Sequence, residues 1–443
     1  MLTTHVLLPL YNYLKNDRSL SYVAEILSFI GSPEEEILKR QLDRIRYMCD
    51  YAYRHTTYYR NLFDDLGIQE PARLTLEDYR RIPVLSKAII RDRLDDLKSR
   101  EFTEGELRKT ATGGTTSSPT AFYSDWDATY RKRSATAVFD GWMGFLPGMK
   151  AAYLWGASQD FAQPKSLKQK LLNDLVQRQL FLAATPLDDE IMEQYYRTLR
   201  SYRPFLLQSY PNPLEIFADF LKRKAYRLDI AALSCTAEPL LDSQRSLISE
   251  VFRQVPCNWY GAREAGRIAT ECALHDGMHV NSYCLHVDVV TSTYVDSGMG
   301  SIVLTDLWNK AMPLIRYEIG DVGRITADPC PCGCPLPRIL EMQGRVTDTF
   351  VNSRGQKIAG VGFTNRYIKD AREIAAMQII QHAIGEFEIK VVAAERFGPD
   401  TEAWLRQKLD EFMLEPTRLS ITQVREILPE NSGKTRFCKN LIL

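Results

Sequence analysis

The 443-residue sequence lacks both a long apolar run and an excess of charge of either sign. Glycine, proline or charged residues interrupt the longest apolar stretches well before the roughly 18–20 residues that a membrane-spanning helix requires. Lys plus Arg and Asp plus Glu both number 56, so the net charge favours neither nucleic acid nor an anionic membrane as a partner. The apolar run near residue 6 has no basic region before it and no small-residue cleavage site after it, which predicts a cytoplasmic protein without a secretory signal.

Cysteine and histidine are scarce, and most of them lie between residues 257 and 334. The chain has nine cysteines, and an odd number in a long chain favours reduced thiols or metal ligands over a disulfide scaffold. A Cys-x-x-His pair followed later by Cys-x-Cys suits a structural, tetrahedral Zn²⁺ site. The four predicted ligands are Cys272, His275, Cys330 and Cys332. His279 or Cys334 is a possible substitute for one of them, and ordinary reduced thiols are the alternative.

The chain is too long for one hydrophobic core, since single domains rarely exceed about 250–300 residues. Its first hundred residues have the pattern of amphipathic helices, and residues 110–345 alternate between short β-branched or aromatic runs and helical windows, as α/β proteins do. Residues past 344 change to a compact α+β pattern. We therefore predict a large N-terminal α/β domain with mixed sheets and helices over 1–344 and a small α+β domain over 345–443.

The expected elements of the large domain alternate along the chain. They are helices at 34–53, 74–80, 86–97, 214–223 and 242–253, and strands at 151–156, 205–209, 230–234, 257–260 and 300–305. This order predicts a mostly parallel sheet with crossover helices. Binding sites on such sheets lie beyond the carboxyl ends of the strands.

Segment 110–120, TATGGTTSSPT, combines two adjacent glycines with several hydroxyl side chains. Its backbone N–H groups and hydroxyls are suited to surrounding an anion closely, which predicts a polyphosphate loop. The segment lacks the GKS or GKT ending of a Walker loop, so a P-loop nucleoside triphosphatase is disfavoured. A polar surface turn is the alternative.

Four further residues have the chemistry of a nucleotide site. In NWYGARE, residues 258–264, Tyr260 is suited to stacking on a base and Glu264 to holding a divalent metal. In PLIRYEIGDVG, residues 313–323, Asp321 is suited to accepting hydrogen bonds from the vicinal hydroxyls of a ribose. In NSGKT, Lys434 is suited to reaching a phosphate as a point charge. Ordinary strand-end turns are the alternatives for the first two segments.

Taken in order, with GRVTD at residues 344–348 between the last two, these segments resemble the motifs of the adenylate-forming superfamily. That superfamily comprises acyl- and aryl-CoA ligases, non-ribosomal adenylation domains and luciferases. The branch that looks most similar is phenylacetate–CoA ligase, together with relatives in capsular polysaccharide synthesis. The resemblance runs from Thr112 to Lys434, and in that branch several members bear zinc where the Cys/His pairs lie.

The resemblance implies a small, mobile C-terminal domain and a two-step reaction. A carboxylate attacks the α-phosphate of ATP in the presence of Mg²⁺, giving an acyl-adenylate and pyrophosphate, and a nucleophile, often the thiol of coenzyme A, then takes the acyl group. Because a carboxylate and a triphosphate repel each other, this chemistry requires positioning and cations rather than a protein nucleophile. We expect ATP, Mg²⁺ and coenzyme A as ligands, an aryl or arylacetic acid as substrate, no nucleic acid, and a dimer.

The resemblance also assigns residues to roles. The residues implied to be catalytic are Lys434, Glu264 and Thr115. The implied nucleotide-binding residues are Thr112, Gly113, Gly114 and Thr116 in the phosphate loop, Ala237, Glu238 and Pro239 along the adenine, Tyr260 and Gly261 at the base, and Asp321 and Arg345 at the ribose. Glu264 would bind Mg²⁺, and Asp348 would be the hinge. Candidates for an aromatic wall of the acid pocket are Tyr153, Trp155, Tyr210 and Trp259.

Three positions depart from the family pattern. Gly113 stands where the family has serine, Ser117 where it has glycine, and Arg263 where it has serine or threonine. These departures keep two alternatives open. One is transfer of the activated acyl group to an amine or hydroxyl, in polysaccharide or secondary-metabolite synthesis, and the other is a catalytically inactive homologue.

Overall fold

The computed structural model describes residues 3–111, 120–155, 172–184, 187–290, 298–345, 349–355, 357–359, 363, 371, 373–394, 396–427 and 437–442. The chain divides into two compact units. Unit 1 comprises Met1–Val287, Leu304–Tyr317 and Thr326–Ile339, and unit 2 comprises Asp288–Val303, Glu318–Ile325 and Leu340–Leu443. The domain boundary at residue 345 stays a prediction.

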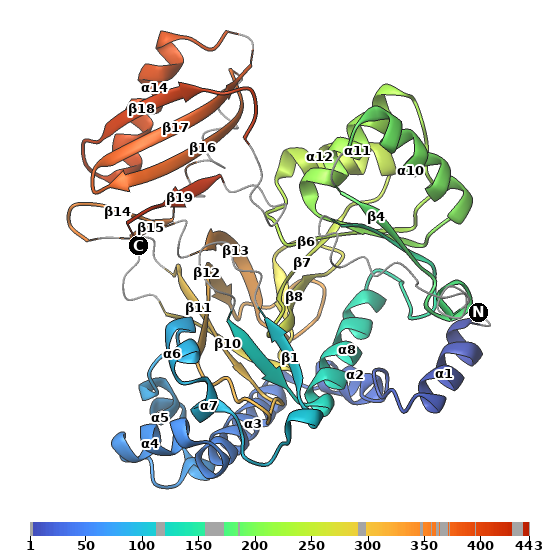
Figure 1. Cartoon of the computed structure of the whole chain (residues 1–443), viewed down its shortest axis with the longest axis vertical. Coiled ribbons are helices and arrows are strands. Elements are labelled where there is room, and N and C mark those ends of the chain that lie inside the picture. The colour runs from blue at the N-terminus through green and yellow to red at the C-terminus, as the bar shows by residue number, and fades with distance from the viewer. Residues whose placement is uncertain are drawn as a thin grey trace. The chain divides into compact units, whose positions relative to one another are not determined.

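The N-terminal part of unit 1 is helical, as the sequence predicts (Figure 1). Its helices are η1 (Thr3–Leu7), α1 (Leu8–Leu14), α2 (Val23–Ile30), α3 (Glu34–His55), α4 (Thr57–Asp65), η2 (Pro71–Arg73), α5 (Leu76–Arg81), α6 (Lys87–Asp92), α7 (Leu94–Leu97) and η3 (Glu104–Glu106). In α3, three glutamates in the first turn and Arg54 and His55 in the last turn complement the helix dipole. The helix predicted at 86–97 divides into α6 and α7 at Arg93, which has φ −122° and ψ 29°.

A mixed sheet is the frame of unit 1. Its strands β4, β3, β5, β6 and β7 are parallel in that order, and β8 and β9 continue the sheet antiparallel to β7. Their bounds are β3 (Ala151–Trp155), β4 (Gln179–Ala183), β5 (Leu206–Ser209), β6 (Ala232–Thr236), β7 (Cys257–Ala262), β8 (Gly266–Glu271) and β9 (Met278–Val280). Strands β1 (Arg108–Ala111) and β2 (Ala121–Ser124) form a separate hairpin. The predicted parallel order is confirmed from β3 to β7.

Helices precede or connect the parallel strands of this sheet. They are α8 (Trp126–Gly141), η5 (Asn173–Gln177), α10 (Asp189–Tyr202), α11 (Pro211–Arg223) and α12 (Asp242–Phe252). Helices α10, α11 and α12 lie together beside β3–β6 (Figure 1). Leu214 and Phe217 of α11 pack in one core with Leu154, Leu207 and Leu233 of the strands. The apolar residues whose spacing predicts a helix over 214–223 thus form the face of α11 that contacts the sheet.

Four strands contribute residues to both units and are neighbours in the order β10, β11, β12, β13. They are β10 (Leu285–Val290), β11 (Gly300–Asp306), β12 (Tyr317–Thr326) and β13 (Arg338–Arg345). Within unit 1, β13 pairs antiparallel with β9, with Arg338 opposite His279. This pairing carries the loop that precedes Arg338 to the end of β9.

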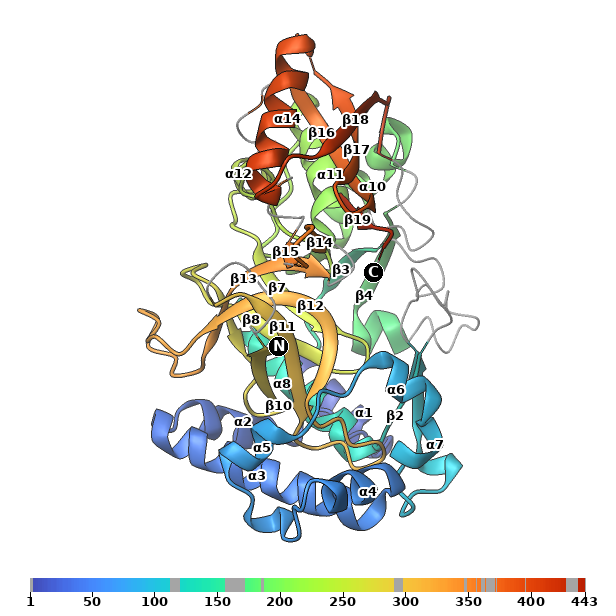
Figure 2. The ribbon, with the colours of Figure 1, turned by 90° about the vertical axis from the view of Figure 1, so that its left-hand side faces the viewer.

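Unit 2 contains a four-stranded sheet covered by one helix (Figure 2). The strand order is β18, β17, β16, β19, in which only β16 and β17 are antiparallel. The elements are β14 (Thr349–Val351), β15 (Lys357–Ala359), β16 (Ile374–Ala383), β17 (Glu386–Ala393), α14 (Pro399–Met413), β18 (Arg418–Gln423) and β19 (Cys438–Asn440). Leu405, Leu409 and Met413 of α14 share a core with Ile379 and Ile389 of the sheet. The predicted α+β pattern is confirmed.

Among the described residues, no helix combines the length and the apolar character that crossing a membrane requires.

Candidate functional site

The hairpin of β7 and β8 carries the residues at the centre of the site. The two strands pair antiparallel, and their register shifts between Tyr260 and Gly261. A Cβ at Gly261 would lie 2.6 Å from the carbonyl oxygen of Gly266 and 2.7 Å from the ring of Trp259. Because no Cβ tolerates such distances, glycine is required for the strands to approach here. The hairpin then closes through the turn that holds Glu264.

Glu264 is buried, with 5% of its surface exposed, and its carboxylate contacts Tyr317 of β12. The hydroxyl of Tyr317, itself fully buried at the start of β12, donates a 2.7 Å hydrogen bond to Glu264 Oε1. Among the described residues no donor hydrogen-bonds the second carboxylate oxygen. A carboxylate held in this way is the type of ligand that Mg²⁺ takes, so the residue fits the predicted metal role.

A buried ion pair holds the same turn from helix α8. Nζ of Lys132 donates a 3.0 Å hydrogen bond to the carbonyl oxygen of Glu264 and lies 2.6 Å from Asp306 Oδ2. The Asp306 side chain is 0% exposed, and that of Lys132 is 13% exposed. Asp306 Oδ1 also accepts hydrogen bonds from the backbone N–H groups of Trp308 and Asn309, at 3.1 Å each. The carboxylate is therefore shared between its own loop and the lysine.

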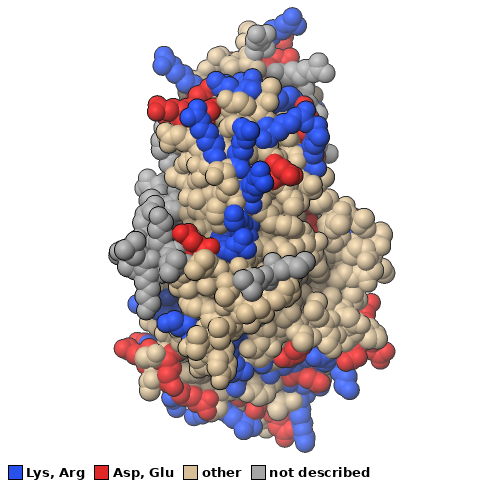
Figure 3. Space-filling model, turned by 90° about the vertical axis from the view of Figure 1, so that its right-hand side faces the viewer, with Lys and Arg blue, Asp and Glu red and all other residues tan. Residues whose placement is uncertain are grey.

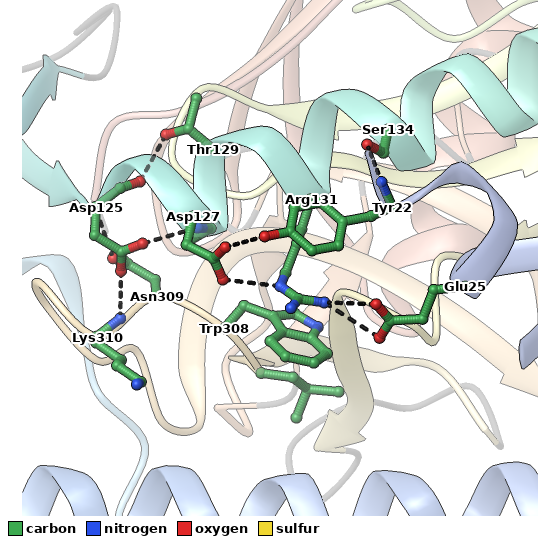
Figure 4. A network of polar contacts seen from close by, with 12 residues as sticks. Tyr22, Glu25, Asp125, Asp127, Thr129, Arg131, Ser134, Trp308, Asn309 and Lys310 are labelled. Atoms are coloured by element: carbon green, nitrogen blue, oxygen red, sulfur yellow. Dashed lines mark hydrogen bonds and ion pairs between the residues drawn. The ribbon is translucent and has the colours of Figure 1, made fainter. Parts of the chain in front are cut away.

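Polar contacts at the N-terminal half of α8 attach this helix to the loop after Asp306 (Figure 4). Asp125 is the N-cap of α8, and its Oδ2 accepts a 2.8 Å hydrogen bond from the backbone N–H of Lys310. The guanidinium of Arg131 lies 3.6 Å from the ring centroid of Trp308 and pairs with Asp127 at 2.9 Å. Helix α8, which carries Lys132, and the loop after Asp306 are therefore joined by contacts other than the Lys132–Asp306 pair.

The adenine-binding segment predicted at Ala237, Glu238 and Pro239 follows β6. Thr236, the last residue of β6, lies opposite Trp259 of the parallel strand β7. Since parallel strands end at the same edge of a sheet, residues 237–239 emerge beside Tyr260. Ala237 has φ 70°, an unusual conformation for a residue with a side chain. The structure thus brings this segment, Tyr260, Gly261 and the Glu264 turn to one edge.

The remaining predicted nucleotide-site residues lie in unit 2 or outside the described residues. Asp321 lies half-buried on β12 and belongs to unit 2, and the backbone of Arg345 ends β13. The side chain of Arg345 lies outside the described residues. So do Thr112, Gly113, Gly114, Thr115, Thr116, Asp348 and Lys434.

Aromatic side chains predicted for the acid pocket lie on or next to the strands of unit 1. Trp155 contacts Tyr210, with ring centroids 4.5 Å apart, and Tyr153 stacks on Phe181 at 4.9 Å. Burial raises the pKa of Tyr153 to about 12, so its phenol is neutral. These contacts describe packing, and the role of the rings in an acid pocket stays a prediction.

Three cysteines and one histidine meet at the end of β9. The ligand atoms of the four residues all lie within 4.8 Å of one another, and the residues are Cys272, His279, Cys330 and Cys332. The sulfurs of Cys272 and Cys330 are 3.9 Å apart, and Cys332 Sγ lies 3.3 Å from His279 Nε2. Two thiolates on a tetrahedral zinc, with Zn–S of about 2.3 Å, lie about 3.8 Å apart, so the group fits this metal.

His279 is oriented for coordination by its second ring nitrogen. Nδ1 lies 3.1 Å from the carbonyl oxygen of Leu336, which leaves Nε2 facing the cysteines, the arrangement that metal-bound histidines adopt. Burial lowers the pKa of His279, which favours the neutral imidazole that a metal requires. The pKa of Cys330 is also lowered, since hydrogen bonds from Cys332 and Cys272 outweigh the burial that would raise it.

The structure places His279, and not the predicted His275, with the cysteines. The pairing of β9 with β13 carries His279 toward the loop at 330–334. His275 Nδ1 instead lies 2.9 Å from Glu271 Oε2 and 3.2 Å from Nη1 of Arg245. Burial alone would raise the pKa of Glu271, but the hydrogen bonds from His275 and Arg245 lower it. His275 thus belongs to a separate ion-pair group, and His279, the predicted substitute, takes its place in the cluster.

Sequence reasoning missed Lys132, Asp306 and Tyr317. Lys132 lies in a helix where lysine is common, and no motif marks it. Asp306 follows the strand predicted at 300–305, so the rule that sites lie at strand ends was the available signal. Tyr317 lies inside the segment 313–323, where Asp321 drew the functional interpretation.

Comparison with known proteins identifies relatives over most of the chain. Phenylacetate-coenzyme A ligase of Thermus thermophilus is 26% identical over 391 residues, which cover 82% of this chain and 83% of the relative. Protein CapK of Staphylococcus aureus is 22% identical over 65% of this chain and 62% of the relative. Residues 350–441 match the family model of the CapK C-terminal domain. The chain is a homologue of phenylacetate-coenzyme A ligases and of CapK.

A solved structure agrees with this homology. The crystal structure of 2-hydroxyisobutyryl-CoA ligase in the postadenylation state, in complex with R3-HIB-AMP, aligns with a TM-score of 0.68. The alignment covers 90% of this chain and 88% of that chain at 19% identity. The homologue therefore has the mixed α/β fold of adenylate-forming ligases with a C-terminal domain, and the resemblance and fold class predicted from sequence are confirmed.

Proposed function

We propose that this homologue activates a carboxylic acid with ATP as an acyl-adenylate and then transfers the acyl group to coenzyme A. The acid would be an aryl or arylacetic acid. The observation that carries the proposal is the common location of residues 237–239, Tyr260 and Glu264 at one edge of the sheet. Homology to phenylacetate-coenzyme A ligases supports it, with the Thermus thermophilus enzyme 26% identical over 82% of this chain.

The described residues would mainly hold groups in position. Glu264 would hold Mg²⁺, which when bound offsets the negative charge of the ATP phosphates. Tyr317 and Lys132 would keep the Glu264 carboxylate and its turn in one place, so that little reorganisation is needed during the reaction. Tyr260 would stack on the adenine beside residues 237–239.

Other roles in the proposal rest on the resemblance alone. They are the phosphate contacts of Thr112, Gly113, Gly114, Thr115 and Thr116, the ribose contacts of Asp321 and Arg345, the hinge at Asp348, and the positive charge of Lys434 at the α-phosphate. Lys434 would lie on a mobile domain, so its departure after the first step would admit the second acceptor.

We also propose a structural zinc ion at Cys272, His279, Cys330 and Cys332. Support comes from the donor set, the ligand spacing and the hydrogen bond at His279 Nδ1. Four protein ligands leave no open position, so the ion would tie the end of β8 to the loop at 330–334 rather than take part in chemistry.

The test is acid-dependent exchange of pyrophosphate into ATP, screened over aryl, arylacetic and aliphatic acids. The proposal expects exchange with an aromatic acid, followed by release of AMP when coenzyme A is added. Lys434→Ala should lower exchange by at least about a hundredfold, because a removed transition-state charge contact is worth about 3 kcal/mol. Lys408→Ala is the matched control, since Lys408 pairs with Glu411 on the surface of α14. Exchange by Lys434→Ala at the wild-type rate would reject the assignment of Lys434.

The departures at Gly113, Ser117 and Arg263 keep a second candidate for the acceptor open. Transfer to an amine or hydroxyl would leave the first step unchanged. AMP release that depends on such an acceptor and not on coenzyme A would select this reaction. Absence of exchange with every acid would instead identify an inactive homologue.

A further inference from the structure

The N-terminal helix turns an apolar stripe toward solvent. In η1 and α1 the exposed positions are His5, Val6, Pro9, Leu10, Tyr13 and Leu14. Their spacing of one, three and four residues makes one face of a helix. Val6 is 50%, Leu10 53%, Tyr13 83% and Leu14 71% exposed. A helix on a water-exposed surface ordinarily places polar residues on this face, so the stripe is unusual.

Neighbouring segments extend this apolar surface. A Cβ at Gly148 would lie 3.1 Å from Thr4 Cα, so the loop that contains Gly148 packs closely on η1. Leu146 of that loop is 40% exposed. Helix η5 contacts both η1 and α1 and contributes Leu175, which is 51% exposed. We name the six exposed side chains the apolar patch: Val6, Leu10, Tyr13, Leu14, Leu146 and Leu175.

Basic side chains border the apolar patch. Arg178 donates from Nη1 to the carbonyl oxygen of Gly148, and Nζ of Lys150 donates to the carbonyl oxygen of Tyr202. Arg200 and Arg203, at the end of α10 next to Tyr202, are exposed. Among the described residues, none of these four cations lies within ion-pair distance of a carboxylate. Figure 3 shows lysine and arginine side chains in a column on this face, above a broad surface with few charged side chains.

We propose that the apolar patch docks on an anionic lipid bilayer, with η1 and α1 lying in the plane of the headgroups. Exposed leucine and tyrosine side chains would enter the boundary between headgroups and acyl chains, and the basic border would contact lipid phosphates. A second copy of the chain is the less favoured occupant, since a twofold contact would bring the same unpaired arginines together. The inference concerns a surface and does not depend on the proposed function.

Sedimentation of the full-length chain with vesicles tests the proposal. We expect binding to phosphatidylcholine vesicles with about a quarter phosphatidylglycerol, and binding that weakens as salt is raised. Leu10→Ser with Leu14→Ser should weaken binding at least about tenfold, because the variant lacks two apolar side chains that the wild type would transfer from water into the bilayer. Arg200→Gln with Arg203→Gln should weaken binding to the anionic vesicles by about tenfold or more and leave the weak binding to phosphatidylcholine alone unchanged.

Two controls match these variants in exposure. Leu38→Ser changes a leucine that is 57% exposed on α3, and Arg73→Gln changes an arginine whose side chain is 82% exposed beside Glu70. Neither should alter binding. If the double leucine variant fails to fold, Tyr13→Ser alone replaces it, since that side chain has the largest exposed fraction of the patch.

Three outcomes would overturn the proposal. The first is absence of sedimentation with either vesicle. The second is binding that neither double variant weakens. The third is a concentration-dependent dimer without vesicle binding that Leu10→Ser with Leu14→Ser abolishes, which would identify a second copy as the occupant.

Discussion

The ion pair between Lys132 and Asp306 predicts a large and specific loss of stability when one partner is removed. In Lys132→Met the methionine keeps the apolar stem, which lies near Gly266, and removes only the charge. Asp306, with a side chain that is 0% exposed, is then left as a buried carboxylate with backbone donors on one oxygen only. Removing one partner of a buried pair costs about 3–5 kcal/mol, so the free energy of unfolding should fall by that amount.

Thermal unfolding of Lys132→Met measures this loss, with a midpoint lowered by about 4–8 °C for a unit of this size. Arg133→Met is the matched control on the same helix, because Arg133 is exposed and its 3.6 Å pair with Asp17 is worth less than about 1 kcal/mol. Lys132→Met with Asp306→Asn should recover much of the stability, since no buried charge remains unpaired. If Lys132→Met costs no more than the control, or if the double variant loses the sum of both single effects, the pair does not anchor the turn.

Two further predictions concern the metal cluster and the N-terminal half of α8. Purified protein should contain about one zinc ion per chain, and Cys330→Ser should lose the ion and unfold at lower temperature. The control is Cys438→Ser, which changes a buried cysteine outside the cluster and should retain the metal. Wild-type protein without zinc by metal analysis would reject the site. Burial would raise the pKa of Asp127, but hydrogen bonds from Tyr22 and Arg131 lower it, so its contribution to stability is present above the unfolded pKa of about 3.9 and is lost as pH falls through the lower folded value. Asp127→Asn should therefore cost at most about 1 kcal/mol at pH 7 and progressively less below about pH 4, and a cost independent of pH in urea titrations would contradict this.

Periodicity and strand-end motifs were sufficient to predict the fold class and the strands that place residues 237–239, Tyr260 and Glu264 at one edge. The apolar spacing of 34–53 and the runs at 257–260 and 300–305 correspond to α3, β7 and β11, because local pattern and burial agree there. The sequence does not reveal where antiparallel strands join a parallel sheet. That information lies in long-range pairing, and the choice between His275 and His279 depended on it.

Sequence reasoning missed the residues that hold the Glu264 turn in place. Lys132 and Asp306 are 174 positions apart by their numbers, and only the folded chain brings them within 2.6 Å. Nothing in the composition of α8 distinguishes Lys132 from Arg131 or Arg133, which serve other contacts. Buried polar partners of this kind are set by packing, and packing is not encoded in a local window.

The positions of the four cluster residues along the chain determine when the cluster can form during synthesis. Cys272 and Cys330 meet across 58 residues, and β10, β11 and β12 lie between them. A nascent chain that has emerged only to the end of β12 contains one thiol and one imidazole of the four donors. On the ribosome, all four donors are therefore available only after these strands have been synthesised. Binding of the proposed zinc ion would then show that residues 330–332 have folded back onto Cys272 and His279.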